Sequence, residues 1–302
     1  MDRDRRQGGA VGRRARRGDA GAHSVVPFAR FQRQTIDWLD LMHRQHTIHA
    51  LLEIDVTDVR RRIRESRAKT GEPLSFTAFV VASLARAIAE DRRMHAYRTG
   101  RGRLVLFDDV DVTVLVEREL EGDRVPVPVI VRAADKKRCR DITREIRAAQ
   151  TGPAPQSGSI PWLPFWLAVP RVLRLAMWTW LLGNPRRRKR LTGTVAVTAV
   201  GMFGVGMAWA IPLTNYTLCL TVGSIGRKPG IVRGGARGED ERIVPREFLS
   251  LTLSVDHDVI DGAPAARFAA RLKELVESGA VLADPAVAAP TGASLAGGAG
   301  GA

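Results

Sequence analysis

A single histidine lies among three acids in the segment DHDVIDG, Asp256 to Gly262. A neutral imidazole with a pKa near ~6.5 can take a proton from a thiol of pKa about 8.5 and return it later, which a carboxylate does poorly at neutral pH. One interpretation is therefore thiol chemistry with His257 as the general base. The alternative is a surface ion pair or a satisfied core histidine, and the spacing of the acids does not decide between the two.

The patterns on each side of this segment indicate where the histidine lies. In residues 249–255, Leu and Val alternate with Ser and Thr, as in a strand with one buried face. After Gly262, apolar residues recur at helical spacing as far as Gly279. His257 and Asp261 are thus predicted at a strand-to-helix junction, which holds side chains rigidly at a sheet edge near the positive end of a helix dipole.

The rest of the chain alternates between the two periodicities, and this mixed order predicts an α/β (α+β) fold. Prolines in the apolar run at 125–131 favour an edge strand or a strand end. Helices are predicted near 31–45, 75–91 and 138–149, the second of them capped by Ser75. Strands are predicted at 49–59, 103–107, 110–117, 125–131, 192–201, 216–225 and 248–255.

Several segments together carry a resemblance to a known family. The motif at 256–262 is similar to D-H-R-x-x-D-G, and the chain resembles the catalytic domains of the dihydrolipoamide acyltransferases of 2-oxo acid dehydrogenase complexes, which are related to chloramphenicol acetyltransferase. The resemblance covers about 25–280 and implies a chloramphenicol acetyltransferase-like two-layer sandwich with a mixed sheet and flanking helices. The further similar segments are 53–59, 71–88, 125–137, 192–205 and 222–230.

This resemblance implies a CoA-dependent acyltransferase that moves an acyl group between coenzyme A and a thiol such as dihydrolipoamide, or a small acceptor. His257 would be the general base, Thr198 in TVAVTAVG the oxyanion donor, and Asp261 a supporting acid. Thr198 has an alternative interpretation as an ordinary strand threonine. Arg33 in RQTI resembles an N-terminal arginine of the family. The family forms trimers with active sites at subunit interfaces, so a homotrimer or higher assembly is expected, without a metal.

Two positions in the motifs depart from the family pattern. Asp258 stands where the family has Arg, and Ala199 where Asn is common. A carboxylate close to the imidazole would raise its pKa and leave less free base at neutral pH. The alternative function is therefore a catalytically weak trimeric scaffold, or a membrane-associated binding protein, of the same fold. The acyl group, the acceptor and the CoA-binding residues stay open.

We expect one acyltransferase catalytic domain at 25–284, between a disordered basic tail at 1–24 and a disordered Ala/Gly/Pro tail at 285–302. No lipoyl domain or lipoyl lysine is recognised in these residues. The lipoyl group is therefore expected in trans, on another protein, unless the acceptor is small and free.

A Trp-rich insertion occupies about 159–190 of this domain. Residues 160–182 hold four tryptophans, with Arg171 and Arg174 near the middle. A membrane-spanning helix needs about 20 mostly apolar residues, and each central arginine costs roughly 2.5–3.5 kcal/mol, which argues against spanning. The composition favours a helix lying on a membrane surface against anionic headgroups. It is equally consistent with an amphipathic hairpin packed on the trimer, or with a cover over an acceptor pocket.

The net charge of +15 is concentrated in two places. Residues 1–18 hold seven Arg and two Asp, and RRRKR follows at 186–190. A nucleic-acid reader usually spreads basic residues and stacking aromatics over a folded face, so this pattern argues against nucleic-acid binding. Cys139 and Cys219 form no CxxC pair and are interpreted as free buried thiols. With no apolar signal at the start, we expect a cytoplasmic protein, peripheral at the membrane if the insertion binds there.

Overall fold

The protein is described by a computed structural model over most of the predicted catalytic domain. The two predicted tails and Arg33 lie outside the described residues, as do the first tryptophans of the insertion, Trp162 and Trp166. The described ranges are 36–37, 39–42, 45–100, 102–120, 123–152, 169–200, 206–234 and 240–283.

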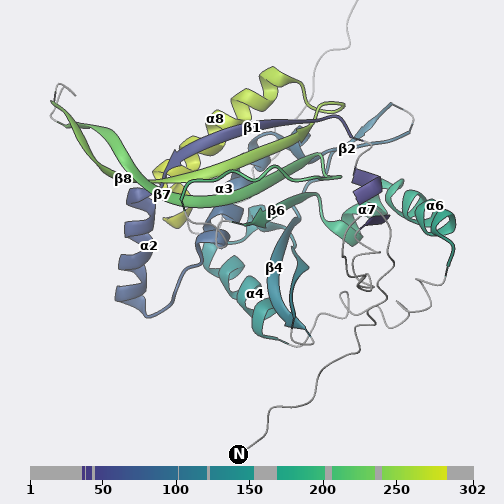
Figure 1. Ribbon diagram of the computed structural model, residues 1–302, viewed down its shortest axis with the longest axis horizontal. Coiled ribbons are helices and arrows are strands. Elements are labelled where there is room, and N and C mark those ends of the chain that lie inside the picture. The colour runs from purple at the N-terminus through teal and green to yellow at the C-terminus, as the bar shows by residue number, and fades with distance from the viewer. Residues whose placement is uncertain are drawn as a thin grey trace, which may run out of the picture.

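A six-stranded mixed sheet forms the centre of the molecule, in the order β1-β8-β7-β6-β4-β5 (Figure 1). Strand β6 runs parallel to both of its neighbours, and the remaining pairs are antiparallel. A small ribbon of β2 (Tyr97–Arg98) and β3 (Leu104–Val105) stands apart from it. The sheet strands are β1 (Thr47–Asp55), β4 (Val112–Leu120), β5 (Asp123–Val131), β6 (Val195–Ala199), β7 (Leu218–Gly234) and β8 (Asp240–Asp256).

Helices α3, α4 and α8 cover one face of this sheet, which gives the two-layer α/β arrangement that the sequence predicts. The ribbon formed by β7 and β8 projects at one end of the molecule, and α6 and α7 lie at the other (Figure 1). The helices are α2 (Thr57–Thr70), α3 (Phe76–Glu90), α4 (Cys139–Thr151), α6 (Arg171–Leu182), α7 (Pro185–Thr192) and α8 (Gly262–Ser278), with short 3₁₀ turns η1 (Arg92–His95), η2 (Ala134–Lys136) and η4 (Ala280–Leu282).

The core lies between the sheet and the helices, and the alternation in β8 supplies its centre. Leu249, Leu251 and Leu253 are buried there against the apolar stripe of α8. That stripe is the predicted one, Phe268, Leu272, Leu275 and Val276. Each buried Leu of this kind contributes roughly 1.5–3 kcal/mol through removal of its side chain from water.

The opposite face of β8 is buried as well, although the sequence pattern predicts only one buried face. Ser250, Thr252 and Ser254 are fully buried. The chain after β6 returns across this face: the Ala208 N–H donates to Ser224 Oγ at 2.7 Å, and the Trp209 indole N–H donates to the Leu52 carbonyl at 3.1 Å. A polar strand face gives no sequence signal of such a cover, because hydroxyls occur equally on solvated faces.

The predicted boundaries differ most from the observed ones around the end of β1 and in the ribbon of β7 and β8. The strand predicted at 49–59 ends at Asp55, whose Oδ1 accepts hydrogen bonds from the Thr57 N–H at 3.0 Å and the Thr57 hydroxyl at 2.7 Å and so starts α2. Helix α2 is not predicted, because only Val59 among its residues is buried. Strands β7 and β8 also extend beyond the predicted ends as a ribbon, in which Ile231 pairs with Ile243 and both are exposed.

Other predictions are confirmed by the structure. Ser75 caps α3, since its hydroxyl accepts from the Ala78 N–H at 3.3 Å. Strand β5, with Pro126 and Pro128, is an edge strand. Cys139 and Cys219 are free and buried, and burial raises their thiol pKa values to about 11 and about 12, which keeps both thiols protonated at neutral pH.

A buried imidazole ties η1 to the strands beside it. His95 is fully buried, with Nε2 3.1 Å from the Phe107 carbonyl and Nδ1 3.1 Å from Thr194 Oγ1. The carbonyl can only accept, so Nε2 carries a proton, while Nδ1 faces the Thr194 hydroxyl, which also has the Asp111 carbonyl at 3.1 Å. Burial lowers the pKa of His95 from 6.5 to about 4.

This burial predicts a loss of stability in mild acid. Between pH 6.5 and 4 the unfolded chain binds a proton at His95 that the folded chain does not, so this residue's contribution is complete above pH 6.5 and falls by up to about 3 kcal/mol towards pH 4. Urea unfolding of the wild type and of His95→Gln across this range measures the effect. Because carboxylates also titrate here, the difference between the two proteins is the relevant quantity, and equal pH slopes would contradict the prediction.

Candidate active site

His257 stands directly after β8, in the turn that leads into α8. Its backbone N–H donates to the His46 carbonyl at 2.8 Å, which fixes the main chain beside the start of β1. Its side chain is 46% exposed, and Nδ1 lies 4.0 Å from Oδ1 of Asp261, which is 85% exposed. Asp261 is the N-cap residue of α8 without a side-chain cap bond, so its carboxylate is free to face the imidazole. The structure therefore brings together two of the three predicted site residues, at an accessible sheet edge.

Asp256 holds the turn in place from inside. Its carboxylate is buried and accepts from the Gln45 side-chain amide at 3.1 Å and from the Asp258 N–H at 3.1 Å. Its main-chain carbonyl accepts from the Val259 and Ile260 N–H groups at 3.1 and 3.0 Å. Burial raises the pKa of Asp256. These bonds fix the backbone conformation of the turn, and with it the direction in which the next side chain, His257, points.

Asp258 is held by a histidine and an arginine from neighbouring parts of the chain. Its Oδ1 lies 2.9 Å from His46 Nδ1, and its Oδ2 lies 3.2 Å from the Arg98 guanidinium on β2. The hydrogen bond from His46 lowers the pKa of Asp258. The carboxylate that replaces the family's arginine is thus engaged by His46 and Arg98, and it acts as a clasp between the turn and these two elements.

Thr198 lies on β6 in a row of hydroxyls that crosses the sheet. It pairs in register with Thr221 on β7, which in turn pairs with Thr252 on β8, so all three point to the face opposite the helices. The hydroxyls of Thr221 and Thr252 are buried, and neither has a hydrogen-bond partner among the described residues. Thr198 is half-buried, and within the described ranges its hydroxyl bonds to no other residue.

This register separates Thr198 from His257 within one chain. His257 is five residues beyond Thr252, about 17 Å along the strand, and two strand spacings add about 10 Å sideways. The backbone positions of the two residues are therefore roughly 20 Å apart, far more than two side chains and one hydrogen bond can span. Both cannot act on one carbonyl group in a single copy of the chain.

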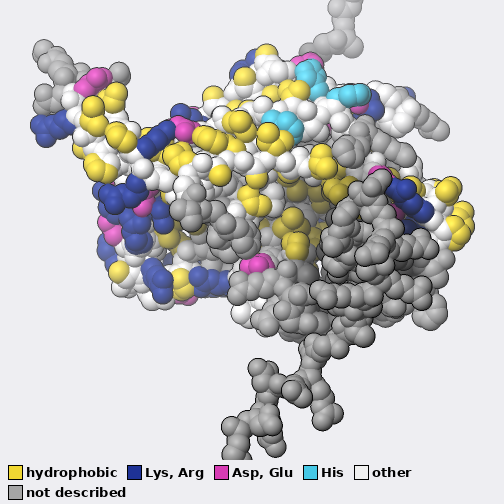
Figure 2. Space-filling view, in the orientation of Figure 1, with side chains coloured by type: hydrophobic (Ala, Val, Ile, Leu, Met, Phe, Trp, Pro, Cys, Tyr) yellow, Lys and Arg dark blue, Asp and Glu magenta, His cyan; other side chains and the backbone are white. Residues whose placement is uncertain are grey.

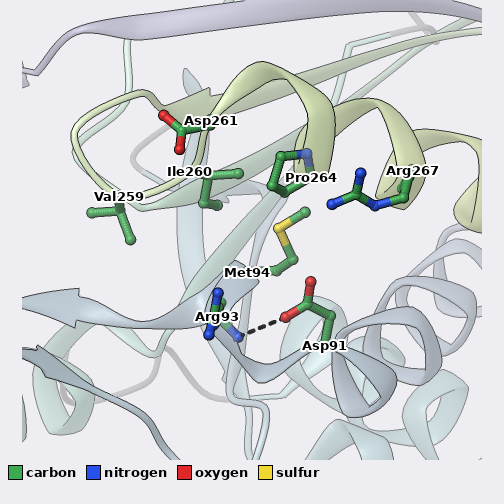
Figure 3. Close-up of a pocket in the computed structure, with 8 residues that line it drawn as sticks. All are labelled: Asp91, Arg93, Met94, Val259, Ile260, Asp261, Pro264 and Arg267. Carbon is green, nitrogen blue, oxygen red and sulfur yellow. Dashed lines mark hydrogen bonds between the residues drawn. The ribbon is translucent and has the colours of Figure 1, made fainter.

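A cavity of about 250 Å³ lies between η1 and the start of α8 (Figure 3). Arg93 and Asp91 line it from one side, and Asp261 and Arg267 from the other, with Met94 between them. Two acids and two cations nearly cancel in charge, and His257 is not part of the lining. The cavity thus lies behind the turn, against Val259 and Ile260, and the imidazole would not meet a substrate there.

The sequence patterns did not predict the residues that hold the turn, namely Gln45, His46 and Arg98. Only the register of β1 with β8 and the position of β2 bring Gln45 and Arg98 to the turn. His46 carries one visible signal, because it is one of three histidines spaced three residues apart in 43–49. In the described part of the chain, no group of three His, Cys, Asp or Glu side chains could hold a metal ion.

Comparison with known proteins places this geometry in a family context. The family described as 2-oxoacid dehydrogenases acyltransferase (catalytic domain) matches residues 20–154 and 187–283. The match omits residues 155–186, most of the Trp-rich segment. The lipoamide acyltransferase component of the branched-chain alpha-keto acid dehydrogenase complex of Bacillus subtilis is 29% identical over 238 residues, which are 76% of this chain and 46% of that protein. The chain spans about half the length of such relatives.

Two solved structures illustrate the similarity of fold. The cubic core of a pyruvate dehydrogenase multienzyme complex aligns with a TM-score of 0.63 at 19% identity, over 89% of this chain and 99% of that one. The dihydrolipoamide acetyltransferase of Azotobacter vinelandii aligns with a TM-score of 0.61 at 20% identity, over the same shares. At these identities the likeness shows the fold.

The clasp at Asp258 predicts a local effect on the turn. Asp258→Ala removes both contacts, to His46 and to Arg98, so amide hydrogen exchange in 256–261 should become several-fold faster. Mass spectrometry of peptides covering the turn measures this change. Asp261→Ala is the matched control, because it removes a carboxylate of the same turn that contacts only the imidazole, at 4.0 Å. Unchanged exchange in Asp258→Ala would show that the clasp does not hold the turn.

Proposed function

This chain belongs to the family of 2-oxoacid dehydrogenase acyltransferase catalytic domains, and we propose that it moves an acyl group between coenzyme A and a thiol such as dihydrolipoamide. The observation that carries the proposal is the placement of His257 at an accessible turn with the Asp261 carboxylate 4.0 Å from its ring. The buried thiols Cys139 and Cys219 are protonated, so the reaction needs the acceptor's own sulfur as the nucleophile.

In the proposed reaction His257 takes the proton of the attacking thiol. The thiolate then forms a C–S bond to the thioester carbonyl carbon, and the carbonyl oxygen becomes an oxyanion. Collapse of this intermediate breaks the original C–S bond, and the imidazolium returns its proton to the departing thiolate. Asp261 favours the imidazolium through its negative charge. Coenzyme A is a substrate here, with no residue assigned to it.

Thr198 is the proposed donor to the oxyanion, and it would come from a second copy of the chain. Its hydroxyl has no described partner and is therefore available to donate, but it lies nearly 20 Å from His257 of the same copy, by the strand spacings. A rotationally symmetric assembly places the Thr198 surface of one copy against the His257 turn of the next. A homotrimer or a larger assembly is thus part of the proposal, and the cubic core named above is a related fold that assembles.

The acetyltransferase of Azotobacter vinelandii has been studied for the catalytic role of a serine, a histidine and an asparagine. In this chain Thr198, His257 and Asp261 would take corresponding parts: a hydroxyl, an imidazole and a short polar side chain. Asp261 differs from an asparagine by carrying charge, which would strengthen its effect on the imidazolium.

Two single substitutions test the roles. With acetyl-CoA and free dihydrolipoamide, His257→Ala should lose about 10²–10⁴-fold in kcat, and Thr198→Ala about 10²–10³-fold. Thr198→Ser, which keeps the hydroxyl, is the matched control and should retain most activity. Release of CoA is followed in each case. If a folded wild type transfers no acyl group from a panel of acyl-CoAs, the scaffold function replaces the enzyme.

Mixing the two inactive variants tests where the site lies. When His257→Ala and Thr198→Ala chains are co-expressed with different tags, one interface in four pairs an intact His257 with an intact Thr198. About a quarter of the wild-type activity should therefore return in the mixed assembly. No recovery, with mixed assemblies demonstrated by both tags, would contradict a site shared between copies.

A further inference from the structure

Residues 169–192 form a distinct surface, and the family match leaves out the part of them up to residue 186. Residues 169–192 contain α6 and α7, joined at Gly183 and Asn184. Asn184 caps α7, since its side chain accepts from the Arg186 and Arg187 N–H groups at 3.0 and 3.3 Å. Neither helix adds to the apolar core described above. Packing of the apolar core therefore does not account for the side chains that α6 and α7 carry on their surfaces.

A buried ion pair fixes how α6 is rotated. Arg174 Nε lies 2.7 Å from Asp37 Oδ2, and both side chains are buried. Arg171 Nε lies 3.4 Å from the other oxygen of Asp37, and Arg171 also pairs with Asp40. Arg174 is thus neutralised inside the protein, and Arg171, which is exposed, is paired with two carboxylates at the surface. Removing one partner of such a buried pair typically costs several kcal/mol, so the helix face that carries them is held inward.

The opposite face of α6 is apolar and exposed. Val172, Leu173 and Trp180 have 76%, 59% and 64% of their surfaces open to solvent, and Ala176 lies between them on the same side of the helix. Figure 2 shows hydrophobic side chains on the outer surface at the end of the molecule where α6 lies, with Lys and Arg beside them. Soluble chains seldom leave an aliphatic and indole face of this kind unpartnered.

The charged side chains of α6 and α7 themselves are all basic. Residues 171–192 contain six Arg and one Lys and neither Asp nor Glu. Arg171, Arg174 and Lys189 pair with carboxylates, whereas Arg186, Arg187, Arg188 and Arg190 have no carboxylate partner among the described residues. The Arg187 guanidinium lies 3.8 Å above the ring of Trp180. Cations therefore border the exposed indole directly.

We propose that α6 and α7 bind an anionic phospholipid surface. The axis of α6 lies parallel to the membrane, Val172, Leu173 and Trp180 enter the boundary between headgroups and acyl chains, and Arg186 and Arg190 face the phosphates. An exposed aliphatic and tryptophan face with unpaired guanidinium groups beside it complements a surface of uniform negative charge. None of the helices in the described ranges is long and apolar enough to cross a membrane. The inference is independent of acyl transfer, which a soluble acceptor reports without vesicles.

The test is sedimentation of the full chain with sucrose-loaded vesicles of phosphatidylcholine, with and without phosphatidylglycerol. Binding is expected with phosphatidylglycerol and should weaken with salt. Leu173→Asp should reduce it at least tenfold, because a carboxylate would enter the apolar boundary. Ile243→Asp is the matched control: this isoleucine is 75% exposed, at the far end of the molecule, and its replacement should leave binding unchanged.

The contribution of charge is tested in the same way. Replacing Arg186 and Arg190 by Gln should weaken binding on the order of tenfold, and the same change at Arg67 and Lys69, exposed on α2, should not. The seven Arg of residues 1–18 are common to all variants, so they cannot produce these differences. Circular dichroism checks that each variant is folded.

Two results would overturn the proposal. If Leu173→Asp and Ile243→Asp bind equally, the α6 face does not enter the membrane. If the folded wild type binds neither kind of vesicle, the lipid assignment is wrong and a protein partner becomes the occupant to search for.

Discussion

The register of β8 between β1 and β7 is the constraint on which the rest of the structure depends. Successive side chains of a strand face opposite ways, so a shift of one residue would place Leu251 and Leu253 under the return segment and Thr252 in the apolar core. The same register puts Asp256 beside Gln45 and the His257 N–H beside the His46 carbonyl. Core packing and the geometry of the candidate site are therefore set by one choice of pairing.

Local patterns predicted much of this fold. The alternation in β8, the stripe of α8 and the cap at Ser75 each follow from periodicity or hydrogen-bonding chemistry within a few residues. Helix α2 was not predicted, because only one of its side chains, Val59, is buried and the helix therefore shows little apolar periodicity. The imidazole and its acid were predictable from their four-residue spacing together with the family likeness. Gln45 and Arg98 were not, because their positions follow from contacts across more than a hundred residues of chain.

The α6 and α7 region and the candidate site are physically connected. The Arg188 guanidinium lies 4.0 Å above the Tyr97 ring, and the next residue, Arg98, clasps Asp258. Lys189 donates to the Asp109 carbonyl at 3.0 Å, on the segment just before β4. The helix that carries the uncompensated arginines thus also braces the ribbon that holds the His257 turn. A displacement of α7 would therefore act first on β2, through Arg188 and Tyr97, and only then on the His257 turn, through Arg98 and Asp258.

The two edges of the sheet are closed by different means. On β5, Pro126 and Pro128 are two residues apart and remove donors from the same outer side. On β1, the Trp209 indole occupies the Leu52 carbonyl, and Glu277 accepts from the Asp55 N–H at 3.3 Å. A foreign strand therefore finds no uninterrupted row of donors and acceptors at either border. Blocked edges of this kind disfavour the joining of sheets from neighbouring copies at high local concentration, which is the contact that starts amyloid growth.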